Sequence, residues 1–117
     1  MDFSFDETQQ AVQDAARQIL EGMVTHERLK EIERTDDLRF DRAVWTELAK
    51  ANLLGVGLPE EVGGSGLGFL EVAIVLEQVG RTVAPVPVYP VLVLGALPVA
   101  AFGTPEQKKA LLPGVAA

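Results

Sequence analysis

The chain has 117 residues, of which 48% are hydrophobic and 23% are charged, with no cysteine, one histidine and a net charge of −7. This composition predicts one compact domain and excludes disulfides, thiolate metal sites and a cysteine nucleophile. Seventeen carboxylates against ten cations argue against a nucleic-acid partner, because phosphates repel an acidic surface. We also expect no metal site, since one histidine is too few for a histidine-rich one.

The first third of the chain predicts two helices. Asp6 and Gln9 have the spacing of a capping box at the start of an amphipathic helix over about 6–22. Residues 25–37 are dense in charge and predict a short, mostly solvated helix, with opposite charges paired three residues apart at 27/30 and 31/34. We interpret His26 as a surface residue, because no ligating partner lies nearby in the sequence.

The middle of the chain predicts a third helix and two connections. Asp41 is expected to cap the helix, and Asn52 to follow it in the left-handed conformation. Residues 53–59 are apolar and glycine-punctuated, which favours a short extended connector. Residues 63–68 hold four glycines and predict a tight turn with positive φ rather than a phosphate cradle, because the G-x-G-x-x-G spacing and a Walker lysine are missing.

Three further helices are predicted in the second half. The first covers 69–79 and is expected to end at Gly80. The next begins near residue 87 or 90, ends at Phe102 and should bend at Pro98. The last begins at the capping residue Thr104 and ends near 113–114. Together the pattern predicts an all-α orthogonal bundle of five or six helices, forming a single domain over 1–117.

Residues 82–105 carry no charge and are numerous enough to cross a bilayer. The stretch holds five prolines, however, and proline removes backbone donors that hydrocarbon cannot replace. We therefore expect a segment buried within a protein and no membrane span. The acidic N-terminus lacks the features of a secretory signal, which predicts a cytoplasmic location.

No self-sufficient active site is visible in the sequence. Glu71 and Glu77 are six residues apart on one predicted helix, so they point in different directions and do not form an acid–base pair. A glutamate in such an apolar helix is more typical of a cap, an ion pair or a groove. The serines and threonines have no histidine or lysine base placed to activate them. We therefore predict no catalytic residue in this chain.

Several stretches, taken in order, resemble the N-terminal domain of the acyl-CoA dehydrogenase family over essentially the whole chain. They are residues 6–12 (DETQQAV), 45–49 (WTELA), 53–67 (LLGVGLPEEVGGSGL), 77–81 (EQVGR), 94–98 (LGALP) and 102–113 (FGTPEQKKALLP). The P-E-E-x-G-G and F-G-T-x-E-Q-K segments, in this order and separation, are far more specific than any single motif.

The resemblance implies a larger enzyme. Family members add a middle β-domain and a C-terminal helical domain, assemble as oligomers, and use FAD to desaturate an acyl-CoA thioester. A glutamate removes the α-proton, the flavin takes the β-hydride, and electrons leave through electron-transfer flavoprotein. Nothing in this chain matches the catalytic base or the flavin contacts. We therefore expect the isolated chain to be inactive and to bind no FAD, with its partners being its own missing domains or a homologous subunit.

The family's N-terminal domain supplies one wall of the acyl pocket from the start of its fifth helix. Carried over to this sequence, the candidate substrate-binding residues are Val86, Pro87, Pro90, Val91 and Leu94. On a helix, positions 87, 90, 91 and 94 would share one apolar face. The alternative is that these residues are ordinary core facing neighbouring domains. Proline at 87 and 90 departs from the family pattern and would reshape the helix start.

Three hypotheses follow from the sequence. The chain is the N-terminal domain of a longer acyl-CoA dehydrogenase, a stand-alone helical interaction subunit that docks on a catalytic flavoprotein, or a membrane-associated helical protein. The alanine, valine and proline richness of 82–98 resembles actinobacterial members of the family, some of which act on steroid side chains as assemblies of unlike subunits. Fatty-acid and steroid substrates both remain open.

Overall fold

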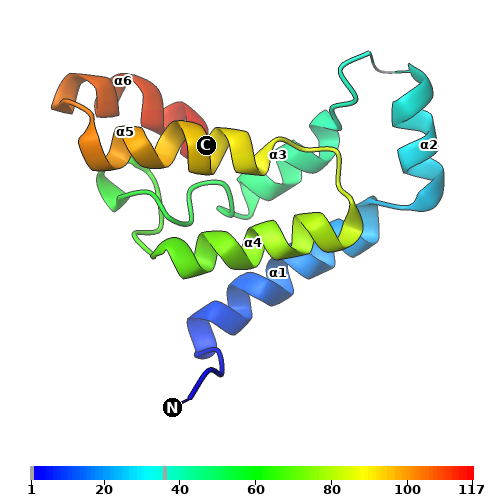
Figure 1. Ribbon diagram of the computed structural model, residues 1–117, viewed down its shortest axis with the longest axis horizontal. Helices are drawn as coiled ribbons and strands as arrows, with labels where there is room; N and C mark the ends of the chain where they lie inside the picture. Colours follow the sequence, from blue (N-terminus) through cyan, green and yellow to red (C-terminus); the bar gives the residue numbers. More distant parts are fainter. Residues whose placement is uncertain (1, 36) are drawn as a thin grey trace.

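The computed structural model describes residues 2–35 and 37–117, and within them the secondary structure is helical, with no strand (Figure 1). The predicted all-α class is confirmed. The elements are α1 (Glu7–Met23), α2 (His26–Thr35), α3 (Arg42–Lys50), the short 3₁₀ helix η1 (Glu60–Val62), α4 (Phe69–Thr82), the π-helical η2 (Tyr89–Ala96), α5 (Leu97–Phe102) and α6 (Pro105–Ala116).

The predicted capping boxes start α1 and α6. The Asp6 carboxylate accepts from the Gln9 backbone N–H at 2.8 Å, and the Gln9 side chain accepts from the Asp6 N–H at 3.0 Å. Thr104 and Gln107 make the same reciprocal pair, with distances of 2.9 and 3.2 Å. Each box satisfies donors that the first helical turn would otherwise leave open, so both helix starts are fixed by local sequence.

The core has two parts. The larger one lies between α1, α3 and α4, which Figure 1 shows side by side at the centre of the molecule, and η2 covers it with Leu92. The smaller one contains Leu58, Ala96, Leu112 and Ala116, where α6 packs against η1 and η2. Burial of such side chains contributes about 1.5–3 kcal/mol each for the larger ones, which makes these clusters the main source of stability.

Residues 53–59 form consecutive turns rather than the extended connector that their composition favours. Leu53, Leu54 and Val56 are almost fully buried in the larger core, whereas Leu58 is buried in the smaller one. The segment therefore joins the two parts of the core. A straight strand would send alternate side chains to opposite faces, and the turns allow all four apolar side chains to be buried instead.

The glycine-rich stretch 63–68 is a tight turn, as predicted, with φ of 89° at Gly63 and 69° at Gly66. Asn52 also adopts the predicted left-handed conformation, with φ of 62°. Gly64 is confined by packing rather than by φ. A Cβ atom on it would lie only 2.2 Å from the carbonyl oxygen of Leu58 and 2.7 Å from that of Gly55.

Two helix ends were wrongly predicted. α4 continues past Gly80 to Thr82 and ends at Val83, which is left-handed with φ of 56°. α6 continues through Pro113 to Ala116. Glycine weakens a helix only modestly, and Pro113 removes one backbone donor without preventing helical φ. Burial of Ala116 in the smaller core holds the last turn of α6 in place.

The predicted helix leading to Phe102 is present but begins as a π-helix. η2 passes directly into α5 (Figure 1), and the Leu97 N–H donates to the carbonyl of Leu92, five residues back. Pro98 has no N–H, and its ring would collide with the carbonyl four residues earlier in a regular α-helix. The wider π turn before Pro98 gives its ring more room at this point, and the predicted bend stays a prediction. Among the described residues, no helix is long and apolar enough to cross a bilayer.

We predict opposite effects for two glycine-to-alanine changes. Gly64→Ala should destabilise the fold by about 3 kcal/mol or more, because the methyl group would overlap backbone atoms that cannot move independently. Gly80→Ala places its methyl group in open space within α4 and should stabilise by roughly 0.5–1 kcal/mol. Urea denaturation followed by circular dichroism measures both changes. Equal stabilities for the two variants would contradict the described packing of the turn.

Candidate functional site

The five candidate substrate-binding residues lie on one continuous stretch of chain. Val86 and Pro87 belong to the irregular segment 84–87 between α4 and η2, and the other three belong to η2. Val86, Pro87 and Val91 are partly buried, whereas Pro90 and Leu94 are exposed, Leu94 by 60%.

The structure divides these residues between two surfaces. Val86 and Pro87 border a cavity of about 370 Å³ whose other side is formed by residues 38–40. Val91 borders a different cavity of about 370 Å³, between η2, α5 and α6. Pro87 precedes the helix, so it does not continue the helical face that its spacing from residues 90, 91 and 94 suggested. Their role in binding substrate stays a prediction.

Residues 38–40 were not predicted to lie near the candidate wall. They face it because the backbone N–H of Asp41 donates to the carbonyl of Pro85 at 3.0 Å. Phe40 is held in place by an edge-on contact with the Trp45 ring, centroids 6.1 Å apart, and by the guanidinium of Arg42, which lies 5.4 Å above its face. No pattern in the sequence signals a contact between segments so far apart along the chain.

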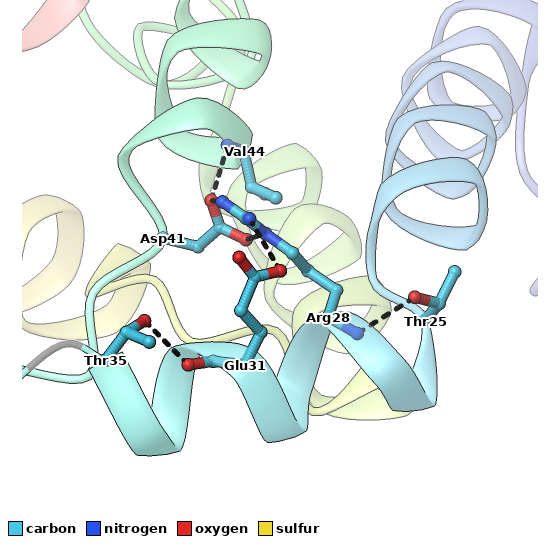
Figure 2. A network of polar contacts seen from close by, with 6 residues as sticks. All are labelled: Thr25, Arg28, Glu31, Thr35, Asp41 and Val44. Atoms are coloured by element: carbon cyan, nitrogen blue, oxygen red, sulfur yellow. Dashed lines mark hydrogen bonds and ion pairs between the residues drawn. The ribbon is translucent and has the colours of Figure 1, made fainter.

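A bidentate ion pair between Arg28 and Asp41 holds the start of α3, the helix that follows residues 38–40 (Figure 2). Arg28 of α2 donates from Nε to Asp41 Oδ2 at 2.9 Å and from Nη2 to Oδ1 at 3.1 Å. Asp41 is fully buried and also caps α3 by accepting from the Val44 N–H at 3.3 Å. The capping role of Asp41 is confirmed. The ion pairs that the structure shows for α2 come from Arg28, to Asp41 and Glu31, rather than from the predicted local pairs.

Electrostatics follow from this geometry. Hydrogen bonds from the Arg28 guanidinium lower the pKa of the Asp41 carboxyl below its ordinary value, against the opposing effect of burial. The same contact raises the pKa of Arg28. The pair is therefore ionised at neutral pH, and the buried charge is compensated by two direct hydrogen bonds and a helix cap.

Glu71 has a structural role. One of its oxygens accepts from the Gly68 N–H at 3.0 Å at the start of α4, and the other accepts from the Gln9 side chain at 3.3 Å. Of the three roles expected for these glutamates (a cap, an ion pair or a groove), Glu71 has that of a cap, while Glu77 is exposed on another face of α4. The two carboxylates do not converge on a site.

Four large apolar side chains on η2, α5 and α6 are exposed, and together they are called the apolar surface. Tyr89, Leu94, Phe102 and Leu111 are each more than half exposed, Phe102 by 90%. Isolated apolar side chains are common on protein surfaces, whereas contiguous groups of large ones are typical of surfaces that bind another structure.

Comparison with known proteins identifies the family. Residues 6–117 match the family model described as "Acyl-CoA dehydrogenase, N-terminal domain". This chain belongs to the acyl-CoA dehydrogenase family. It is 37% identical over 109 residues to acyl-CoA dehydrogenase FadE27 of Mycobacterium tuberculosis, which covers 93% of this chain and 29% of FadE27.

Solved structures show the same relationship. The Tcur3481–Tcur3483 steroid ACAD variant is 50% identical, with a TM-score of 0.88 over 94% of this chain and 30% of that one. The ChsE4–ChsE5 complex from Mycobacterium tuberculosis is 34% identical, with a TM-score of 0.87 over 97% and 32%. The chain therefore has the fold of this family's N-terminal domain and spans about 30% of the length of these relatives.

The described residues do not fit a flavin site, although the family uses FAD. A pyrophosphate needs free backbone N–H groups or a cationic cradle. In the glycine-rich turn every N–H from 63 to 68 already donates within the turn and its flanks, to carbonyls of residues 55–60 or to Glu71. Lys108 and Lys109 line a cavity of about 410 Å³, but Glu61 lines it too, and its carboxylate would repel a phosphate. Among the described residues, no three of His, Asp or Glu gather to hold a metal ion.

The lowered pKa of Asp41 makes a pH-dependent prediction. The folded value lies below the ordinary 3.8, so the ionised pair stabilises the fold above that pH, and its contribution is lost as the pH falls through the folded value. Asp41→Asn should cost about 1–2 kcal/mol at pH 7, and this difference should shrink below about pH 3.8. Urea denaturation of both proteins between pH 7 and pH 2 measures it.

Glu47→Gln is the matched control, because it removes an exposed ion pair with Lys50 within α3. Exposed pairs of this kind contribute little, so this variant should stay close to wild type throughout. A wild-type to Asp41→Asn difference that stayed constant down to pH 2 would contradict the ionised pair.

Proposed function

We propose that this chain is the N-terminal domain of an FAD-dependent acyl-CoA dehydrogenase, which introduces a double bond between the α and β carbons of an acyl-CoA thioester. Within that enzyme it contributes one wall of the acyl pocket, from Val86, Pro87, Pro90, Val91 and Leu94, together with contacts to the other domains. The observation that carries the proposal is the match to the family's N-terminal domain over 6–117, supported by the same fold at up to 50% identity.

The surface chemistry of the wall supports this role. No charged residue occurs from 82 to 105, and the exposed side chains of η2 are apolar or aromatic. Such a surface suits a hydrocarbon chain or a ring system and excludes water from the cleft that it borders. Prolines at 85, 87 and 90 reduce the freedom of this segment, so the wall loses little entropy when substrate binds.

In this proposal the cofactor and the residues of this chain have separate roles. FAD would be held by residues outside the described part of this chain, and it would supply the hydride acceptor of the reaction. The residues of this chain hold the acyl group beside that chemistry and keep the cleft dry, which strengthens the electrostatic interactions of a base located elsewhere. The chain supplies orientation and exclusion of water, and no proton-transfer group.

The partners follow from the same proposal. The similar solved structures are of protein pairs, a Tcur3481–Tcur3483 protein and a ChsE4–ChsE5 complex, which supports a parent enzyme assembled from several subunits. We propose acyl-CoA as substrate, electron-transfer flavoprotein as electron acceptor, and other domains or a homologous subunit as the cover of the apolar surface. A cytoplasmic location and the lack of a nucleic-acid partner stay predictions.

The acyl-wall proposal is tested by Val86→Phe in the flavoenzyme that contains this domain. The larger side chain should fill the cavity beside residues 38–40 and lower kcat/KM for a ring-bearing acyl-CoA by about tenfold or more relative to a short straight-chain one. Val62→Phe makes the same change on η1, beside a different cavity, and should leave the ratio unaltered. Equal ratios in both variants would contradict the assignment.

A second prediction concerns the isolated chain. Purified alone, it should show no absorbance near 450 nm and should not desaturate an acyl-CoA, because its glycine-rich turn has no free N–H for a flavin phosphate. Mixed with a catalytic flavoprotein of the family, the chain should co-elute only if the interaction-subunit hypothesis holds. A yellow, active isolated chain would contradict the proposed division of labour.

A further inference from the structure

An ion pair between Arg28 and the fully buried carboxylate of Asp41 connects α2 to the start of α3. The guanidinium holds both carboxylate oxygens, at 2.9 and 3.1 Å, while about a third of the Arg28 side chain stays exposed (Figure 2). Two parallel hydrogen bonds fix the orientation of the carboxylate as well as its charge. Because Asp41 is also the N-cap of α3, its backbone is held together with its side chain.

The backbone of Asp41 reaches the predicted acyl wall. Its N–H donates to the carbonyl of Pro85 at 3.0 Å, immediately before Val86 and Pro87. The other backbone bonds of segment 84–87 run within it or to its neighbours in sequence, in α4 and η2. Within the described part of the chain, Asp41 therefore supplies the backbone hydrogen bond that ties this segment to a distant element.

Two properties of segment 84–87 would transmit a displacement of Pro85 to Val86 and Pro87. Pro85 and Pro87 have fixed φ angles, so fewer backbone rotations are available to absorb a movement of the neighbouring peptide. The bond from the Val86 N–H to the carbonyl of Ala84, at 2.9 Å, tightens the turn further. The cavity beside Val86 is closed on its other side by residues 38–40, which directly precede Asp41. One residue thus sets both sides of that cavity.

We propose that Arg28 is a positioning residue for the acyl wall: it holds Asp41, whose backbone holds Pro85 and sets the width of the cavity between residues 38–40 and 84–87. The claim that this segment faces substrate rests on the proposed function. The claim that Arg28 holds the segment rests on the contacts alone. Arg28 touches no substrate and acts only through Asp41.

Removing the guanidinium leaves a buried carboxylate without its cation. The carboxylate must then take up a proton or turn towards water, and either change disturbs the α3 cap and the N–H that binds Pro85. Lysine keeps the positive charge but cannot donate to both carboxylate oxygens in one plane. The effect of Arg28→Lys should therefore lie between wild type and a variant with an uncharged side chain. The effect should be local to Asp41 and the wall, rather than spread evenly over the fold.

Native-state amide hydrogen exchange in the 117-residue chain tests the positioning role. In Arg28→Gln, protection of the Asp41 N–H should fall by about tenfold or more beyond any change at Leu20, a fully buried residue in the last turn of α1. In Arg28→Lys the loss of protection should lie between that of this variant and wild type. If Arg28→Gln fails to fold, the double variant Arg28→Gln/Asp41→Asn keeps hydrogen-bonding groups without a buried charge and gives the same readout.

Leu112→Ala is the matched control, because it weakens the separate smaller core. It should lower the protection of Asp41 and Leu20 by similar factors, as a general loss of stability does. If the Arg28 variants behave like this control, or leave Asp41 protection unchanged, the positioning role is overturned.

Steady-state kinetics of the flavoenzyme separate this inference from the proposed function. Arg28→Lys should shift the kcat/KM ratio between ring-bearing and short acyl-CoA in the same direction as Val86→Phe, mainly through KM. If exchange at Asp41 changes and neither variant alters the ratio, Arg28 positions the segment but the segment is not the acyl wall. If Val86→Phe alters the ratio and Arg28→Lys does not, the positioning role is overturned and the wall stands.

Discussion

The buried carboxylate of Asp41 is the constraint around which α2, α3 and segment 84–87 are arranged. It caps α3, accepts two hydrogen bonds from Arg28 on α2, and through its own N–H holds the carbonyl of Pro85. A charge buried this completely is tolerated only when it is fully paired. The pairing therefore fixes the relative positions of α2, α3 and the segment before η2 in one step.

Packing around the two core clusters explains the irregular elements. The turns at 53–58 deliver apolar side chains to both clusters, and Gly64 lets the glycine-rich turn lie directly against them. η2 is a π-helix that runs directly into α5, and Pro98 lies in the first turn of α5. The result is a segment whose buried residues join the core while Tyr89 and Leu94 stay exposed.

Local signals predicted most of the fold. The caps at Asp6 and Thr104 and the left-handed Asn52 depend on neighbours within a few residues, so the sequence displays them directly. The contact of Asp41 with Arg28 joins two segments that the sequence does not show to be adjacent, and the passage of α4 through Gly80 reflects how little one glycine weakens a helix. The packing of residues 84–87 against 38–40 is likewise not visible in the sequence. The candidate wall was therefore predicted as one helical face, whereas Val86 and Pro87 border one cavity, Val91 borders another, and Pro90 and Leu94 are exposed.

We propose that this domain forms a wall of the acyl pocket in a flavoenzyme whose reactive groups lie elsewhere. Photo-crosslinking of the assembled enzyme with an acyl-CoA that carries a diazirine at the end of its acyl group, followed by peptide mapping, tests this proposal. We expect adducts within residues 84–94, suppressed by excess unlabelled substrate. Competable adducts confined to residues outside this domain would contradict it.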